Sequence, residues 1–309
     1  MSKSNHKISL IILSRMLKDA FKELIKNDPL RMAGATAFFT TFALPPILII
    51  IIQVLGLVFN PDKISQKLFE KLSDIVGTSS VHQIVETLTA FRKLAYNWFV
   101  TITGFIFLAF VATTLFKVIK GSLNQVWRIK ESGNRSLWVN LRTRIQSVLV
   151  ILVAAFLFVI GLLTAAAQAF LGKYIFALSP QLSFYFTSGL NYIVSIIMVM
   201  LWFAIVFRYL PDGRPVWNVA LTGALLTSIL FNTGKLALHW LLNKSNIIAL
   251  YGPSASIVLL LLFVFYSSLI LYYGAAFTKI WGMYHDKPIM PLPHAMHYTL
   301  TDDTSPAIH

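Results

Sequence analysis

Six long, mainly apolar stretches dominate this chain and constrain what it can fold into. They cover roughly residues 34–58, 97–119, 145–171, 184–209, 216–242 and 254–281. Each has about 20 or more residues, which is enough for a helix rising 1.5 Å per residue to cross about 30 Å of membrane hydrocarbon. The pattern predicts an all-α, polytopic membrane protein whose six transmembrane helices form one domain over residues 34–281.

The composition supports a membrane protein and narrows its chemistry. Hydrophobic residues make up 57% of the 309 residues, and charged residues only 12%, whereas soluble domains carry about 25% charged residues. There is no cysteine, so disulfides, iron–sulfur clusters and thiolate metal sites are excluded. A net charge of +14 would suit nucleic-acid binding in a soluble protein. Here the basic residues gather in loops on one side of the membrane, and we expect no nucleic-acid partner.

The distribution of basic residues predicts the orientation of the chain. Of the 26 lysines and arginines, 18 fall in connections on one side of the six spans and seven on the other, while Lys235 lies within a span. Cytoplasmic loops carry the excess of basic residues, so both termini are predicted to be cytoplasmic. We expect no cleavable signal peptide, because the apolar stretch ISLIIL is short and a charged segment follows it.

Three segments outside the spans have their own predictions. Residues 1–33 contain an amphipathic helix with a basic face, which either lies in the cytoplasmic membrane interface or packs against the base of the bundle. Residues 59–96 carry two apolar stripes at helical spacing, which predict two short external helices that either cap a cavity or rest on lipid. Residues 282–309 are predicted to be a polar cytoplasmic tail, in which His294 and His297 are solvated rather than bound to a metal.

The first span contains a pair of prolines in the sequence TTFALPPIL. Pro45 and Pro46 remove two backbone donors and predict a kink or break in the helix. Thr40 and Thr41, one turn earlier, could bond the carbonyls that the break frees. Broken helices near the middle of the membrane recur in transporters, but kinks also arise from helix packing alone, and both interpretations stay open.

The fifth span carries Asn232, Lys235 and His239 at a spacing that places them on one face of a helix. A charge at membrane depth is costly and marks a candidate functional site. Lys235 is seven residues from the outer end of the span, or roughly 10 Å at 1.5 Å per residue, so its side chain could instead reach toward the outer surface. The stripe is therefore either a site for an anionic group or a lysine extending to the membrane surface.

Other residues suggest binding or packing roles. Arg31 belongs to a set of arginines that could collect anionic groups at the cytoplasmic mouth, although ordinary loop charges have the same pattern. Gly274 and Ala275, late in the sixth span, should allow a neighbouring helix to approach closely. Polar residues such as Asn124 are expected to hold helices together.

Four stretches carry a family resemblance: NDPLRMAGATAFFTTFALPPILIIIIQVLG (27–56), GSLNQVWRI (121–129), FRYLPDGRPVWNVALTGALLTSILFNTGKLAL (207–238) and YGPSASIVLLLLFVFYSSLILYYGAAFT (251–278). With the spacing between them, the chain resembles the YihY/BrkB family. The resemblance implies six transmembrane helices, a bacterial inner-membrane location and, for some members, export or movement of lipid-like molecules. Many members have a glutamate where this chain has Ala276, so a mechanism that needs that carboxylate does not carry over.

An old label for the family, a tRNA-processing ribonuclease, is not supported by the residues. None of the twelve acidic residues lies within a predicted span, and no zinc, phosphate-loop or nucleophile motif is present. We therefore predict no catalytic residue, metal or cofactor, and no intrinsic ATP-driven pump.

Transport is the leading functional prediction. The substrate would be amphipathic or anionic, either lipid-like or siderophore-like, with membrane lipids and a second copy of the chain as possible partners. The alternative is a non-transporting membrane scaffold or envelope-integrity protein. A polar cavity reaching Lys235 would favour transport, whereas a solid bundle with Lys235 facing lipid would favour the scaffold.

Overall fold

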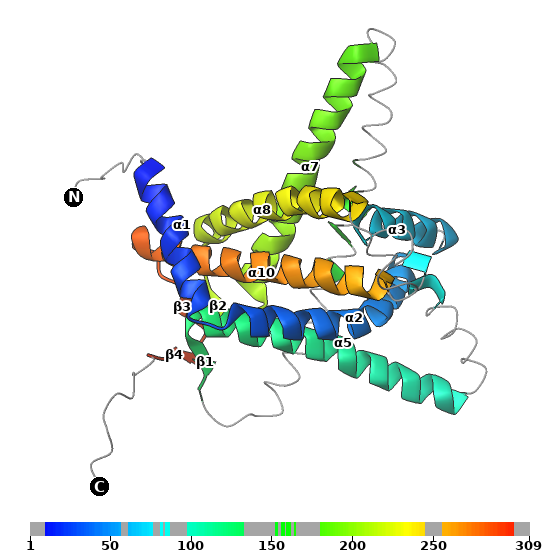
Figure 1. The fold of residues 1–309 in the computed structure, drawn as a ribbon. Helices are drawn as coiled ribbons and strands as arrows, with labels where there is room; N and C mark the ends of the chain where they lie inside the picture. The colour runs from blue at the N-terminus through cyan, green and yellow to red at the C-terminus, as the bar shows by residue number, and fades with distance from the viewer. Residues whose placement is uncertain are drawn as a thin grey trace.

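The computed structural model describes residues 10–56, 61–76, 81–82, 84–86, 98–132, 152–153, 156–157, 159–161, 164, 180–244 and 255–299. Most of these residues are helical (Figure 1). The helices are α1 (Leu10–Ile25), α2 (Pro29–Gly56), α3 (Pro61–Val76), α5 (Trp98–Trp127), α7 (Pro180–Tyr209), α8 (Trp217–Lys244) and α10 (Ala255–Tyr284).

Helix α10 lies at the centre of the bundle. It contacts α1, α2, α3, α5 and α8, while α2 also packs against α5. In Figure 1, α8, α10, α2 and α5 lie one above another, and α7, which packs against α8, rises steeply from them. The largest cluster of buried apolar side chains includes Trp127, Phe207 and Phe277 and draws on all seven helices, so one core joins the bundle.

Five of the six predicted spans coincide with helices α2, α5, α7, α8 and α10, each 28 or 30 residues long. Within the described residues, three stretches are long and apolar enough to cross a membrane: Tyr192–Tyr209, Trp217–Leu238 and Ile257–Tyr284. The third predicted span, 145–171, falls mostly outside the described residues. The number of six spans therefore stays a prediction.

Of the kink or break predicted at Pro45 and Pro46, the structure excludes the break, because α2 continues through both prolines as one helix. Thr40 and Thr41 donate from their hydroxyls to the backbone carbonyls four residues before them, at 2.7 and 3.0 Å. Those carbonyls precede the ones that the prolines leave without a donor, so the threonines make ordinary within-helix bonds. Packing of α2 against α5 and α10 supports a helix that has lost two of its own hydrogen bonds.

Four short strands correct the purely helical prediction. Strand β1 (Ile129–Glu131) pairs with β4 (Ala295–His297), and β2 (Gly213–Arg214) pairs with β3 (Met290–Pro291), both antiparallel. They lie at the same end of the bundle as α1 (Figure 1), which we call the basal end. The backbone N–H of Tyr298 also donates to the carbonyl of Arg128 at 3.0 Å. The segment after α10 is therefore folded onto the bundle as far as Tyr298, and the prediction of a simple polar tail from residue 282 is wrong there.

Helix α1 packs one face against α10. Met16, Ala20 and Leu24 are buried in this contact, and the hydroxyl of Tyr273 donates to the carbonyl of Leu17 at 3.1 Å. Packing against the base of the bundle, one of the two alternatives from the sequence, is thus what the structure contains. The opposite face of α1 remains exposed and mixes apolar and basic side chains: Ile11, Arg15, Lys18, Phe21, Lys22 and Ile25.

Helix α3 corresponds to the first of the two helices predicted for residues 59–96. It begins at Pro61, because proline is favoured at the first position of a helix. It packs against α2 and α10 with Leu68 buried. Of the second predicted helix, only residues 81–82 and 84–86 are described, and they are helical.

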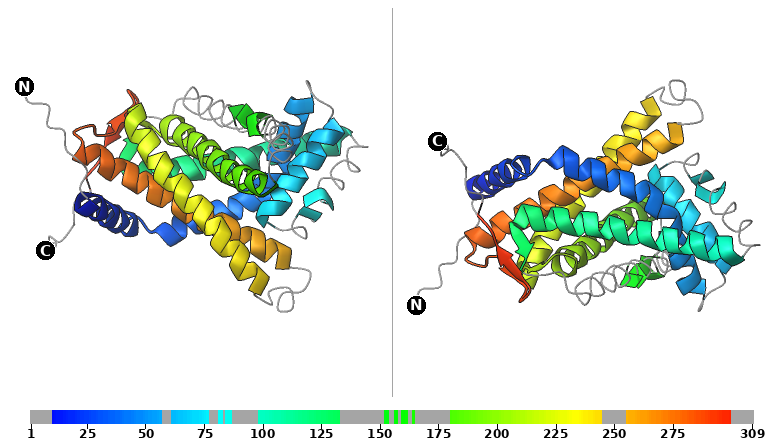
Figure 2. Two further views of the ribbon diagram at one scale, coloured as in Figure 1. Left: turned by 90° about the horizontal axis from the view of Figure 1, so that it is seen from above. Right: turned by 90° about the horizontal axis from the view of Figure 1, so that it is seen from below.

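Helices α8 and α10 cross through two matched glycine–threonine pairs, and the crossing is visible in Figure 2, left. On α8, the Thr227 hydroxyl donates to the carbonyl of Gly223 at 2.6 Å, and on α10 the Thr278 hydroxyl donates to that of Gly274 at 2.7 Å. Each threonine also lies against the glycine of the other helix. A Cβ atom on Gly274 would stand 1.8 Å from Thr227 Oγ1, and one on Gly223 would stand 1.9 Å from Thr278 Oγ1. Small residues four apart on both helices therefore allow this close approach.

Candidate functional site

The basal end contains a buried carboxylate, Asp212, in the turn between α7 and β2. It is 1% exposed. Lys120 Nζ of α5 lies 2.8 Å from Asp212 Oδ1, and Asn124 Nδ2 donates to Oδ2 at 2.7 Å. His294 Nε2 lies 3.0 Å from Oδ1. The backbone of Asp212 is engaged as well, because its N–H donates to Asn124 Oδ1 at 2.8 Å and its carbonyl accepts from the N–H of Leu292 at 2.8 Å.

These contacts make Asp212 a junction between α5, the α7–β2 turn and the segment after α10. Burial alone raises the pKa of a carboxyl group, but the hydrogen bond and charge of Lys120, with the hydrogen bonds from His294 and Asn124, outweigh it and hold the pKa of Asp212 below its ordinary value. The charged pair is buried and well bonded, the arrangement in which removing one partner is most costly. Asp212 therefore serves as a structural anchor that holds these three segments together at the basal end.

A second cluster joins α1 to α10 and to the end of α5. Glu23 Oε1 lies 2.6 Å from Lys279 Nζ and 3.1 Å from Arg128 Nη2. Lys279 Nζ also donates to the carbonyl of Val126 at 2.9 Å. Burial raises the pKa of Glu23, but the hydrogen bond and charge of Lys279 and the charges of Arg128 and Lys26 have the larger combined effect and lower that pKa. The cluster therefore fastens α1 to the bundle through a charged carboxylate.

The lowered pKa values of Asp212 and Glu23 predict a loss of stability in acid. A carboxyl whose pKa is lower in the folded state stabilises the fold above its unfolded pKa, about 4, and loses that contribution as the pH falls through the folded value. We expect the thermal midpoint of the detergent-solubilised protein to fall below about pH 4. Asp212→Asn and Glu23→Gln should each make this fall shallower, whereas Asp28→Asn, at an exposed carboxylate, should keep the wild-type profile. Equal pH profiles in all four proteins would contradict the assignment.

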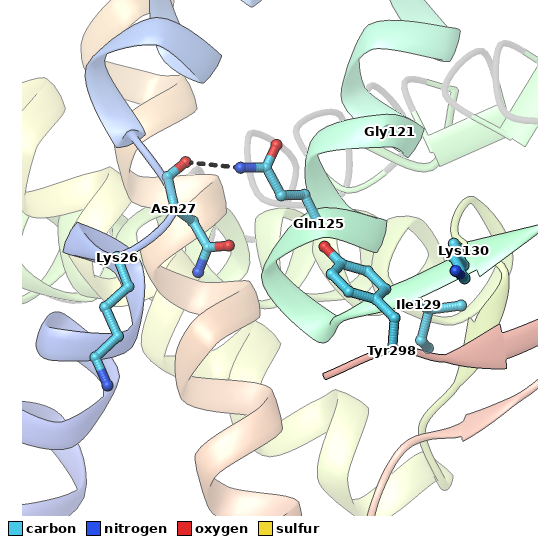
Figure 3. A pocket seen from close by; sticks show the side chains of 7 residues that line it. All are labelled: Lys26, Asn27, Gly121, Gln125, Ile129, Lys130 and Tyr298. Carbon is cyan, nitrogen blue, oxygen red and sulfur yellow. Dashed lines mark hydrogen bonds between the residues drawn. The ribbon is translucent and has the colours of Figure 1, made fainter. Parts of the chain in front are cut away.

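An open pocket of about 440 Å³ lies beside these clusters. It is lined by residues of the α1–α2 turn, α5, β1 and the segment after β4: Lys26, Asn27, Gly121, Gln125, Ile129, Lys130 and Tyr298. Figure 3 shows Gln125 and Tyr298 between the two lysines, with Lys26 on one side and Lys130 on the other. The pairing of β1 with β4 brings Tyr298 into this wall.

The pocket is basic. Its lining residues include two lysines and no carboxylate, and neither Lys26 nor Lys130 has an ion-pair partner among the described residues. Gln125 is held in place from two sides, since its Nε2 donates to the carbonyl of Asn27 at 3.1 Å and its Oε1 accepts from Arg31 Nη2 at 3.2 Å. In Figure 3 the Lys26 side chain points away from Gln125 and Tyr298, and Lys130 lies on the opposite side of them, so the two lysines make the surroundings of the pocket positive without converging on one point.

Comparison with known proteins identifies the family. The sequence profile of a family described as Virulence factor BrkB matches residues 20–293, which is most of the chain. The chain belongs to the BrkB family. Together with its long apolar helices and the names of its relatives, this makes it a BrkB-family integral membrane protein.

Three relatives of this BrkB-family chain are each named UPF0761 membrane protein. The one from Saccharophagus degradans is 22% identical over 90% of this chain, the one from Actinobacillus pleuropneumoniae 24% over 85%, and the one from Psychromonas ingrahamii 27% over 80%. The matched region spans 62%, 91% and 80% of their respective lengths, so it accounts for less than two thirds of the first. No solved structure matches the BrkB-family chain.

The polar stripe expected on the fifth span is only partly described. Asn232 is 1% exposed, its Nδ2 donates to the carbonyl of Ser228 at 2.9 Å, and its Oδ1 accepts from Ser195 Oγ of α7 at 2.8 Å. Its amide is thus used within the α7–α8 contact rather than toward a ligand. Lys235 is half-buried on α8, and the side chain of His239 lies outside the described residues.

The other predicted residues fall in different parts of the BrkB-family fold. Arg31 is exposed and adjoins the basic pocket through Gln125, so the structure brings it to the basal end and not to the stripe on α8. Gly274 lies in the α8–α10 crossing, and the carbonyl of Ala275 accepts a hydrogen bond from Trp127 Nε1 at 2.9 Å. Ala276, where many BrkB relatives were expected to have glutamate, is fully buried.

Sequence reasoning missed the residues that organise the basal end. It assigned His294 and His297 to a solvated tail. His294 instead binds the buried Asp212, whereas His297 is exposed, with its Nε2 3.0 Å from the carbonyl of Ile289. It counted Asp212 only among the acidic residues outside the predicted spans. Among the described residues, no group of three histidines or acids could hold a metal ion.

Proposed function

We propose that this BrkB-family protein is a transporter or exporter of an amphipathic or anionic substrate in the bacterial inner membrane. In this proposal six helices span the membrane, both termini are cytoplasmic, and the exposed face of α1 lies in the cytoplasmic interface. The observation that carries the proposal is the open pocket at the basal end. There, two lysines that form no ion pair with any residue the structure describes stand beside an amide and a tyrosine.

The charge distribution supports this choice of end. Of the 18 lysines and arginines that the structure describes, 13 lie in the connections and helix ends of the basal side, which favours the cytoplasmic side. A pocket there is placed to receive an anionic group from the cytoplasm or from the inner leaflet. Arg31 would contribute charge at its edge, and Lys235 with His239 on α8 would form a second anionic contact farther along the bundle.

The proposal includes no catalytic step. No nucleotide-binding motif occurs in the sequence, so transport would draw on a gradient or on a partner rather than on ATP hydrolysis by this chain. Phosphate- or carboxylate-bearing compounds, either lipid-like or siderophore-like, fit the polarity of the pocket and of Lys235.

An untargeted comparison of lipids and anionic metabolites tests this function. Cells lacking the protein should accumulate or lose at least one anionic compound relative to wild type, and overproduction should shift the same compound in the opposite direction. Lys235→Ala should behave like the deletion at normal membrane levels, because the charge at the second contact is gone, while Lys117→Ala, at an exposed lysine of α5, should behave like wild type. Altered envelope sensitivity with no shifted compound would instead favour a non-transporting scaffold.

A further inference from the structure

We propose that the basal pocket binds the phosphate of an anionic lipid headgroup, with the acyl chains outside the pocket. This deepens the proposed function by naming the ligand class of the same site. The shared chemistry is a phosphate mono- or diester, which could also come from free phosphate, and the experiment below separates these sources.

The charges in the pocket favour phosphate. Lys26 and Lys130 enter from separate elements, the α1–α2 turn and β1, and both ammonium groups are exposed and without an ion-pair partner among the described residues. Lysine binds phosphate as a point charge. Glu23 is bonded to Lys279 and Arg128, and the charge of Lys26 acts on its carboxylate without a direct ion pair between the two side chains.

Uncharged donors lie between the two lysines and are available to an anion in the pocket. The Tyr298 hydroxyl stands between the lysines in Figure 3 and donates to no protein acceptor within the described chain. Gln125 is fixed by its bonds to Asn27 and Arg31, which keeps this wall of the pocket in place when it is empty. A pre-formed wall lowers the ordering cost of binding.

The surroundings of the pocket favour a lipid over a soluble ion. Lys26 and Asn27 lie in the turn between α1 and the long apolar helix α2, and the flanking Ile25 and Leu30 are 55% and 67% exposed. If α2 enters the membrane, this turn lies at the level of the headgroups, with apolar side chains available to acyl chains. The volume, about 440 Å³, suits a headgroup-sized ligand and exceeds what a single phosphate ion needs.

The test is binding of short-chain lipids to the full chain purified in an uncharged detergent. Titration calorimetry would compare dihexanoyl phosphatidylglycerol, dihexanoyl phosphatidylcholine and inorganic phosphate. We expect the wild-type protein to bind phosphatidylglycerol most tightly. The double variant Lys26→Gln/Lys130→Gln should weaken that binding roughly tenfold or more, since each lysine near a lipid phosphate contributes a several-fold gain. Both lysines are exposed, so this variant should keep the wild-type thermal midpoint.

The matched control is Lys117→Gln/Lys287→Gln, which removes the same charge from exposed positions outside the pocket. It should leave binding close to wild type. An equal loss of phosphatidylglycerol affinity in both double variants would overturn the assignment of the pocket as the binding site. Unchanged affinity in the pocket variant would do the same. Inorganic phosphate binding as tightly as phosphatidylglycerol would overturn the lipid assignment. None of these outcomes depends on transport. The lipid-binding site can therefore be refuted while the metabolite comparison supports transport, and transport can be refuted while lipid binding is observed.

Discussion

Asp212→Asn is expected to lower the free energy of unfolding by about 3–5 kcal/mol, the usual cost of removing one partner from a buried ion pair. The asparagine keeps the shape of the side chain and can still meet Asn124, but Lys120 then remains buried without its closest counter-charge. The midpoint of thermal denaturation in detergent should fall by roughly 10 °C, measured by the loss of the monodisperse peak after heating.

Two further variants make the result specific to the buried pair. Asp28→Asn removes an exposed carboxylate that lies 3.9 Å from Arg31, and such surface pairs contribute about 0–1 kcal/mol. In addition, Lys120→Met combined with Asp212→Asn should cost less than the sum of the two single changes. The lysine change removes a buried charge that, without Asp212, keeps only the longer pair with Glu131 at 3.4 Å. An Asp212→Asn protein as stable as Asp28→Asn would refute the anchor.

Gly274→Ala is expected to disrupt the crossing of α8 and α10. The added Cβ would stand 1.8 Å from Thr227 Oγ1 and 3.0 Å from Thr227 Cβ, so the helices must separate or Thr227 must leave its rotamer. Overpacking of this kind costs about 1–3 kcal/mol, and we expect a lower thermal midpoint of the purified protein.

A second-site change in α8 tests the geometry of this crossing. Thr227→Ala removes the clashing Oγ1 and should restore much of the stability lost in Gly274→Ala. Gly34→Ala is the matched control, because a Cβ at Gly34 meets nothing within 4 Å and the substitution in a helix should be neutral or slightly stabilising. If Gly34→Ala and Gly274→Ala lower the midpoint equally, the close approach of α8 and α10 is not the cause.

The long helices were the part of the fold that could be predicted from the sequence. An apolar run of membrane length must satisfy its own backbone donors and acceptors, which a helix does within the segment. For this reason the predicted spans at 34–58, 184–209, 216–242 and 254–281 coincide closely with α2, α7, α8 and α10. The prolines were interpreted from the same local evidence, but packing against neighbouring helices keeps α2 continuous through Pro45 and Pro46.

The contacts at the basal end could not be predicted from the sequence, because they join residues that are far apart in the chain. Asn124 and Asp212 are 88 residues apart, and Glu23 and Lys279 are 256 apart. No periodic pattern links such residues, and each by itself resembles an ordinary loop or surface charge. The same holds for the strand pairs, since two or three residues are too few to show an alternating pattern before their partners are known.

The sequence by itself determined the class of this protein, the positions of most of its long helices and the basic character of one side, because hydropathy, helical spacing and charge counts are local properties. The tertiary structure alone decided that Asp212 and Glu23 are buried anchors, that the segment after α10 folds back to the base, and that Lys26 and Lys130 share one pocket. These depend on which helix ends meet, and that is set by packing of the whole bundle rather than by any single stretch of residues.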